Sequence, residues 1–235
     1  MGHFIAPAHV PSAGAAVVVS AFVVRRAGGS ILLDTGIGTG LQAGEELYKP
    51  VRRPLDEALR DAGVAIGEVR AVANCHLHFD HSGNNFRFVG IPIFAQRIER
   101  EAASRPDYTL PGPVAQFEGA RFELLEGEAE IVDGVRIVPT PGHVPGHQSF
   151  VIDTREGRIV IAGQAFQDAA AYTRDLYAWR LDRDGAAHPP YAPRVARLQE
   201  STRGASLSRT TSLSGSATRD ARSRGRTRVA ALSAG

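Results

Sequence analysis

In the first half of the chain, short continuous apolar runs alternate with a segment in which apolar residues recur at helical spacing. Apolar residues at 15–24 and 30–34 predict two strands, and Ala27-Gly28-Gly29 between them predicts a hairpin turn. From Pro54 to Ala62 apolar residues recur on one helix face, with proline at the start. A further apolar run at 69–74 predicts a strand that leads directly into a polar cluster.

The second half repeats strand pairs around glycine-containing turns. Asp133-Gly134 is typical of a type I′ hairpin turn, and Glu156-Gly157 separates a second pair of apolar runs. The pattern predicts strands at 91–95, 130–132, 135–138, 149–153 and 158–162, helices at 98–104 and 193–200, and a long loop at 105–118. Many strands with a few helices favour sheets covered by helices, an α+β layer fold.

Residues 201–235 differ in composition from the rest of the chain. They consist almost wholly of Ser, Arg, Ala, Thr and Gly, with seven arginines and the single acid Asp220. The formal charge of +2 for the whole chain therefore divides into +6 for this segment and −4 for residues 1–200. We expect one domain at 1–200 and a disordered tail at 201–235, because such a composition cannot offset its ordering entropy by burial.

The arginine-rich tail has two further interpretations. Clustered arginines can neutralise phosphates, but no aromatic residue accompanies them for stacking and the body of the chain is acidic, so nucleic acid is not expected as a partner. The tail can also be an out-of-frame translation, since arginine greatly outnumbers the single Lys49, a bias typical of GC-rich coding DNA.

Composition excludes several classes of protein. The apolar run at 15–24 is about half the length that a membrane span needs, so no membrane association is expected. No basic segment followed by an apolar stretch opens the chain, which does not support secretion. A lone Cys75 cannot form an internal disulfide and agrees with a reducing compartment, so we expect a cytoplasmic location.

Three imidazoles and a carboxylate lie within six residues directly after the predicted strand at 69–74. In the sequence His76-Leu77-His78-Phe79-Asp80-His81, the first two histidines are spaced to project to the same side of an extended backbone. Imidazole and carboxylate are ligands of Zn²⁺ and similar ions. A histidine-rich surface loop is the alternative, but ligand-type residues gathered at a strand end indicate a metal site.

A second polar cluster spans Thr140-Pro141-Gly142-His143-Val144-Pro145-Gly146-His147. Proline and glycine restrict the loop around each histidine, so His143 can supply a third imidazole with little entropy to lose. For His147 we favour a supporting role beside the ligands. Asp34 either caps a turn or orients a ligand histidine, and the sequence does not decide between these roles.

Taken together, these motifs resemble the metallo-β-lactamase superfamily. The segments that carry the resemblance are 33–36, 76–85, 96–102 and 140–149, and they are most similar to the N-acyl homoserine lactonase branch. The resemblance covers roughly residues 15 to 200. It implies the αβ/βα four-layer sandwich of that superfamily, with its C-terminal part incomplete here, and a site at one edge of the two sheets.

The resemblance also implies roles for individual residues. His76, His78 and His143 would hold the first metal ion, and Asp80 and His81 would belong to a second metal site. Asp80 would in addition carry a proton to the leaving group, as a catalytic residue. One or two Zn²⁺ ions per chain are expected, and other divalent metals are compatible with these ligands.

The sequence departs from the family pattern near its end. Gln164 follows Ala162-Gly163 where the family has a bridging aspartate, and no histidine follows His188 to complete the second site. Gln167 occupies the position of a family tyrosine, with Tyr172 the nearest phenol. A neutral amide offers one carbonyl oxygen but no full negative charge to two cations. His188 could replace the missing ligand, although histidines flanked by proline in loops usually face solvent.

Two functions follow as hypotheses. The first is a metal-dependent hydrolase that opens a small-molecule lactone or related ester with metal-activated hydroxide. The second is a catalytically impaired metal-binding relative that lacks a complete second metal site. A nuclease is also known among the superfamily's activities, but the acidic body argues against it.

Overall fold

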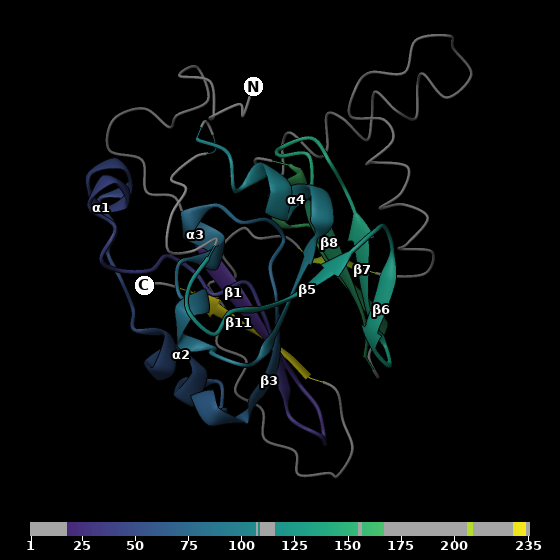
Figure 1. Ribbon diagram of the computed structural model, residues 1–235. Coiled ribbons are helices and arrows are strands. Elements are labelled where there is room, and N and C mark those ends of the chain that lie inside the picture. Colours follow the sequence, from purple (N-terminus) through teal and green to yellow (C-terminus); the bar gives the residue numbers. More distant parts are fainter. Residues whose placement is uncertain are drawn as a thin grey trace, which may run out of the picture.

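Two β-sheets packed face to face form the centre of the molecule (Figure 1). The structure is a computed structural model and describes residues 18–106, 108, 116–154, 157–166, 206–208 and 228–233. Within these residues it shows an α+β arrangement, as the sequence predicts. The helix expected at 193–200 lies outside the described residues, as does most of the central part of the loop expected at 105–118.

The first sheet has six strands, ordered β11-β1-β2-β3-β4-β5. Strands β11, β1 and β2 are antiparallel neighbours, whereas β2 to β5 run parallel. The bounds are β1 Ser20–Arg25, β2 Ser30–Leu33, β3 Val69–Ala73, β4 Pro92–Gln96, β5 Arg121–Leu125 and β11 Arg228–Ser233. The hairpin expected at Ala27-Gly28-Gly29 joins β1 to β2.

The second sheet has five strands, ordered β10-β9-β8-β7-β6. Its bounds are β6 Ala129–Val132, β7 Val135–Pro139, β8 Gln148–Thr154, β9 Gly157–Ile161 and β10 Ser206–Ser208. The β6–β7 hairpin is present at Asp133-Gly134, but its turn is not type I′ as predicted. Gly134 has a φ of 72°, while Asp133 is not among the described residues with positive φ, and a type I′ turn needs both.

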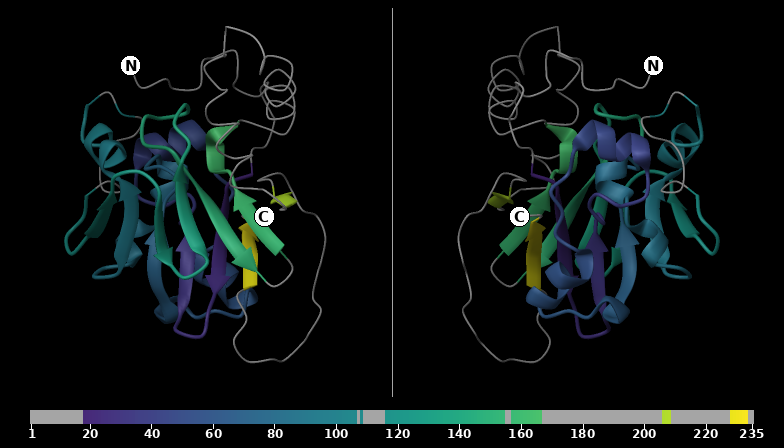
Figure 2. Two further views of the ribbon diagram at one scale, coloured as in Figure 1. Left: turned by 90° about the vertical axis from the view of Figure 1, so that its right-hand side faces the viewer. Right: turned by 90° about the vertical axis from the view of Figure 1, so that its left-hand side faces the viewer.

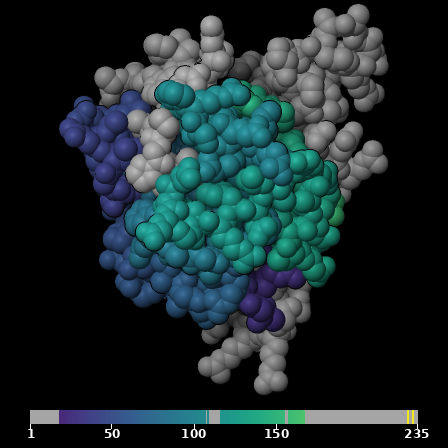
Figure 3. Space-filling view, in the orientation of Figure 1, coloured from purple at the N-terminus to yellow at the C-terminus, as the bar shows by residue number. Residues whose placement is uncertain are grey.

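Short helices connect and cover the strands. Their bounds are α1 Gln42–Tyr48, α2 Leu55–Asp61, α3 Phe79–Ser82 and α4 Arg97–Ala102, with 3₁₀ turns at Ile66–Glu68, Asn85–Arg87 and Gly163–Ala165. The predicted helical face at 54–62 becomes α2. In the space-filling view of Figure 3, the blue residues that include α1 stand at one side of the teal and green body.

Alternation along β1 explains how the first sheet becomes buried on both faces. Phe22 and Val24 point toward the second sheet and share a core with Phe150 of β8. Between them, Val23 points to the opposite face and packs with Leu59 of α2. Successive side chains of a strand face opposite sides, so a strand covered on both faces reads as a continuous apolar run.

The C-terminal segment corrects one expectation. We expected disorder throughout 201–235, but β10 and β11 both lie in this range, and β11 pairs with β1 over the full length of both strands (Figure 2). Leu232 of β11 is buried and packs in the core beneath α2. The composition of residues 201–235 as a whole is rich in arginine, and it obscured the short apolar run around Val229. The edge of β1 supplies the backbone hydrogen-bond partners of this run.

Candidate metal centre

Two loops meet at one end of the two sheets. The first ligand loop, residues 74–78, continues from the end of β3 into α3, and the second ligand loop, residues 140–147, joins β7 to β8. Figure 1 shows α3 and α4 at this same end of the molecule. The loops are joined directly, because the Gln148 amide N donates to the carbonyl oxygen of Cys75 across 2.8 Å. Residues far apart in sequence are thereby brought together.

The structure brings together the three histidines expected at the first metal site. One ligand nitrogen of each of His76, His78 and His143 lies within 4.8 Å of the other two. His143 Nε2 and His78 Nδ1 are 3.1 Å apart. His76 Nε2 is buried, and within the described part of the chain it has no hydrogen-bond partner. An unpaired buried nitrogen is costly, so this donor set fits a cation.

The protonation of these imidazoles suits metal binding. Burial, together with the neighbouring histidines, holds the pKa of His76 well below its usual value. Burial and the nearby His143 lower the pKa of His78 to about 3. Both rings are therefore neutral at pH 7 and have a lone pair to offer.

Asp80 and His81 form a second pair of ligand-type groups. Asp80 Oδ2 lies 3.3 Å from His81 Nε2. Burial by itself raises the pKa of Asp80, but the adjacent His81 lowers it below its usual range. Although burial lowers the pKa of His81, the nearby Cys75 sulfur and the carboxylates of Asp80 and Asp34 raise it well above the usual value. These groups therefore attract each other as carboxylate and imidazolium when no cation lies between them.

Tyr48, which the sequence did not indicate, also reaches this pair. Its hydroxyl donates to Asp80 Oδ1 across 3.1 Å. The helix α1 comes close because Gly44 leaves room for the Phe79 ring, where an added Cβ would lie 2.6 Å from Phe79 Cε1. A phenol from α1 therefore holds the carboxylate of α3.

Asp34 bridges two parts of the first ligand loop and α3. Its Oδ1 accepts from the Cys75 amide N at 2.8 Å, and its Oδ2 lies 2.9 Å from His81 Nδ1. This geometry favours the orienting role over a simple turn cap, because a carboxylate on Nδ1 directs Nε2 toward Asp80. Asp34 has a φ of 59°, a conformation that is uncommon for residues other than glycine and is found more often at functional sites.

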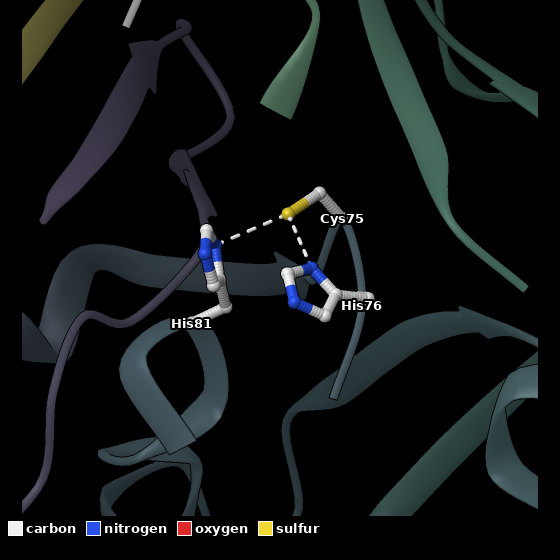
Figure 4. Close-up of side chains that lie close together, drawn as sticks. All are labelled: Cys75, His76 and His81. Carbon is white, nitrogen blue, oxygen red and sulfur yellow. Dashed lines mark hydrogen bonds between the residues drawn. The ribbon is translucent and has the colours of Figure 1, made fainter. Parts of the chain in front are cut away.

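The Cys75 sulfur lies between two of the imidazoles, as Figure 4 shows. It is 3.1 Å from His76 Nδ1 and 3.1 Å from His81 Nδ1. Burial and the nearby Asp34 raise the pKa of Cys75 to about 12, so the sulfur is a thiol at neutral pH. With Nδ1 facing the sulfur, the Nε2 atom of His76 is the one directed to the histidine cluster.

Where the structure describes them, the other residues singled out in the sequence do not belong to the three-histidine cluster or to the Asp80–His81 pair. His147 Nδ1 lies 2.9 Å from Thr140 Oγ1 and 3.1 Å from the Thr140 carbonyl oxygen, an arrangement that agrees with a supporting role. Gln164 Oε1 is buried and has no hydrogen-bond partner within the described residues. His188, Gln167 and Tyr172 lie outside the described residues.

The sequence pattern of the metallo-β-lactamase superfamily matches residues 14–207. With this coverage, and with the two sheets and histidine cluster described above, the chain belongs to the metallo-β-lactamase superfamily. The resemblance inferred from the motifs is thereby confirmed. No helix within the described ranges is both long and apolar enough to span a membrane.

Relatives in this superfamily include N-acyl homoserine lactonases. One from a Bacillus species is 32% identical over 184 residues, covering 73% of this chain and 71% of the relative. The solved structure of a quorum-quenching N-acyl homoserine lactone lactonase aligns with a TM-score of 0.59 and 28% identity over 77% of this chain and 73% of its own.

A second solved structure is of an N-acyl homoserine lactone hydrolase with the product N-hexanoyl-L-homoserine bound at its catalytic metal centre. It aligns with a TM-score of 0.59 and 27% identity, over 77% of this chain and 75% of its own. These relatives are metallo-β-lactamase-fold hydrolases, the enzyme class that the sequence motifs indicate.

Proposed function

We propose that this chain is a zinc-dependent lactonase that opens N-acyl homoserine lactones or closely related esters. The observation that carries the proposal is the convergence of His76, His78 and His143, with the buried His76 Nε2 lacking a partner among the described residues. The similarity to N-acyl homoserine lactonases supports the substrate class.

The three histidines would hold the first cation, and Asp80 with His81 would hold a second. A divalent cation at such a site supplies a Lewis acid that polarises the lactone carbonyl and lowers the pKa of a bound water. His76 and His78 are neutral at pH 7 and offer lone pairs without first losing a proton. Asp34 and Cys75 hold the rings in the orientation that this binding needs.

Asp80 would carry the proton in this proposal. Its carboxylate is kept ionised beside His81, so it can accept a proton from the attacking water and pass it to the leaving alkoxide. Tyr48 donates to the other oxygen, Oδ1, and so orients the carboxylate through this step.

A catalytically impaired metal-binding protein is the second candidate. The observation that favours it is Gln164, whose amide offers one carbonyl oxygen in place of a carboxylate. This candidate predicts a bound cation without turnover.

One experiment separates the two candidates. Hydrolysis of N-hexanoyl homoserine lactone and a panel of other lactones is followed by pH-stat, and zinc per chain is measured on the same sample. The His78→Ala variant serves as the control that removes a ligand. Turnover that the variant loses supports the lactonase, whereas bound zinc without turnover above the free ion supports the impaired relative. A chain that binds no zinc contradicts both.

A further inference from the structure

A buried glutamate in α4 contacts both ligand loops. Glu99 has no exposed surface, although the salt bridges among the described residues do not include it. Its Oε1 accepts from the Leu77 amide N at 3.0 Å, and its Oε2 accepts from the Gly146 amide N at 3.2 Å. Leu77 stands between two predicted metal ligands, and Gly146 follows His143 in the second ligand loop.

The contacts of Glu99 require a carboxylate rather than an amide. The Tyr108 hydroxyl also donates to Oε1, so each oxygen faces only donors. A glutamine has one oxygen and one NH₂ group, and the NH₂ group would face either the Leu77 or the Gly146 N–H. An isosteric amide can therefore accept from one ligand loop but not from both.

Packing brings the same three parts into contact. A Cβ added at Gly146 would lie 2.2 Å from Glu99 Cβ and 2.5 Å from its backbone nitrogen, so only glycine allows this approach. Leu77 and Val144, one from each ligand loop, share a small core with Tyr108. The Tyr108 ring centroid is 5.0 Å from that of His78.

A second link joins the ligand loops on the sheet side. There Gln148 donates from its backbone to the Cys75 carbonyl at 2.8 Å and from its side chain to the Asn74 carbonyl at 2.7 Å. Glu99 provides the link on the side of α4. The Gln148 contacts hold the base of the second ligand loop, where β8 begins, whereas Glu99 holds its tip at Gly146.

We propose that Glu99 is a positioning residue that sets the distance between the two ligand loops, and through it the 3.1 Å approach of His78 Nδ1 to His143 Nε2. The inference rests on the proposed function, because it concerns the same metal site. Among the described residues the hydrogen bonds of Glu99 go to the backbone of both loops and to Tyr108, so it acts through the backbone of the loops.

The test is a Co²⁺ titration of the metal-free full-length chain, which needs no substrate and reports coordination in its visible absorption spectrum. Glu99→Gln is expected to bind Co²⁺ about tenfold more weakly and with an altered spectrum. Glu101→Gln, an exposed glutamate of the same helix, is the matched control and is expected to bind as the wild type does. Far-UV circular dichroism confirms that each variant is folded.

A milder variant keeps the test decisive if Glu99→Gln does not fold. Tyr108→Phe retains the ring and removes only one donor to Glu99, and is expected to weaken Co²⁺ binding about threefold, on the scale of part of one hydrogen bond. Wild-type affinity and spectrum in folded Glu99→Gln, or in Tyr108→Phe when Glu99→Gln is unfolded, overturn the inference. A wild-type chain that binds no Co²⁺ contradicts the proposed function itself, which separates the two failures.

Discussion

The hydroxyl of Tyr48 lies 3.1 Å from Oδ1 of Asp80, and this contact joins α1 to the candidate metal centre. Burial of Tyr48 and the charge of Asp80 raise the pKa of the phenol above its usual value, so Tyr48 stays protonated and remains a donor. Asp80 is therefore restrained from both sides, by Tyr48 at one oxygen and by His81 at the other.

Replacement of Tyr48 by phenylalanine removes this donor and keeps the ring. We expect the free energy of unfolding to fall by about 1 kcal/mol, the usual net value of one hydrogen bond. Lactone turnover is expected to fall by about tenfold or more, because the Asp80 carboxylate loses its orientation. Urea denaturation and pH-stat kinetics measure the two effects. Leu47→Ala, an exposed neighbour on α1, is the control, and equal losses in both variants would contradict the role of the hydroxyl.

Removal of metal should lower thermal stability. A cation that binds the folded chain at one hundred times its Kd stabilises it by about 2.7 kcal/mol. Calorimetry with and without added Zn²⁺ after chelation measures this shift in Tm. His143→Ala removes one of the three clustered imidazoles and should abolish the shift. A zinc-dependent Tm that survives in His143→Ala would show that the cation binds elsewhere.

Asp34→Asn tests how His81 is oriented. Asparagine tolerates the positive φ of this position and can still accept from the Cys75 amide, but its NH₂ group would face His81 Nδ1. We expect a loss of about 2 kcal/mol in stability, as for a hydrogen bond to a charged group, and less metal at the second site. Denaturation and metal content measure these outcomes. Asp61→Asn, which removes only a surface ion pair with Arg53, should cost at most about 1 kcal/mol and leave metal content unchanged. Unchanged stability in Asp34→Asn would contradict the role.

The pKa of Glu99 gives stability a defined pH dependence. Burial raises this pKa above the usual 4.5, against the hydrogen bonds from Tyr108, Leu77 and Gly146. The folded chain therefore binds the proton more tightly than the unfolded chain, and stability falls as pH rises from about 4.5 through the folded pKa. A single proton sets an upper limit of about 1.4 kcal/mol per pH unit on this slope.

Glu99→Gln carries no titrating group at this position, so comparison with the wild type gives the part of the pH dependence that comes from Glu99. As pH rises through the window, the unfolding free energy of the metal-free wild type should fall relative to that of the variant. Chemical denaturation at a series of pH values measures it. A difference that stays constant with pH would contradict the raised pKa.

Leu232 tests the place of the C-terminal strand. Its side chain is buried beneath α2, so Leu232→Ala should cost roughly 2 to 4 kcal/mol. A chain ending before Arg228 should lose more, because β1 would also lose its neighbour. Unchanged stability on truncation would instead favour the interpretation of the tail as an out-of-frame addition.

The sequence predicts the central strands because both faces of the first sheet are covered, which leaves continuous apolar runs such as the one around Val23. It does not predict α1, whose only buried residue is Gly44 and which has no apolar stripe. Without α1, Tyr48 could not be placed at the site. Strand β5 was missed because its residues are half-buried and mix charged with apolar side chains.

The candidate site also contains residues that the sequence predicts and residues that it does not. His76, His78 and His81 are close in sequence, so their spacing alone indicates a metal site, whereas His143 lies 65 residues beyond His78 and joins them only in the fold. Cys75 and Glu99 have no such signal, because their roles depend on groups that meet only in the folded chain: Cys75 contacts His81 across a turn, and Glu99 contacts Gly146 from another sheet connection. The sequence feature that points to Glu99 is its place in the segment 96–102, which carries part of the family resemblance.

The pairing of β11 with β1 has a consequence for how the chain folds during synthesis. Residues 20–25 leave the ribosome about two hundred residues before 228–233, the strand that covers their edge. Until then β1 exposes unpaired backbone groups at the edge of an otherwise complete first sheet, where another chain could add a strand. Until residues 228–233 are made, nascent chains are therefore open to association along this edge, and β11 closes it when it pairs with β1.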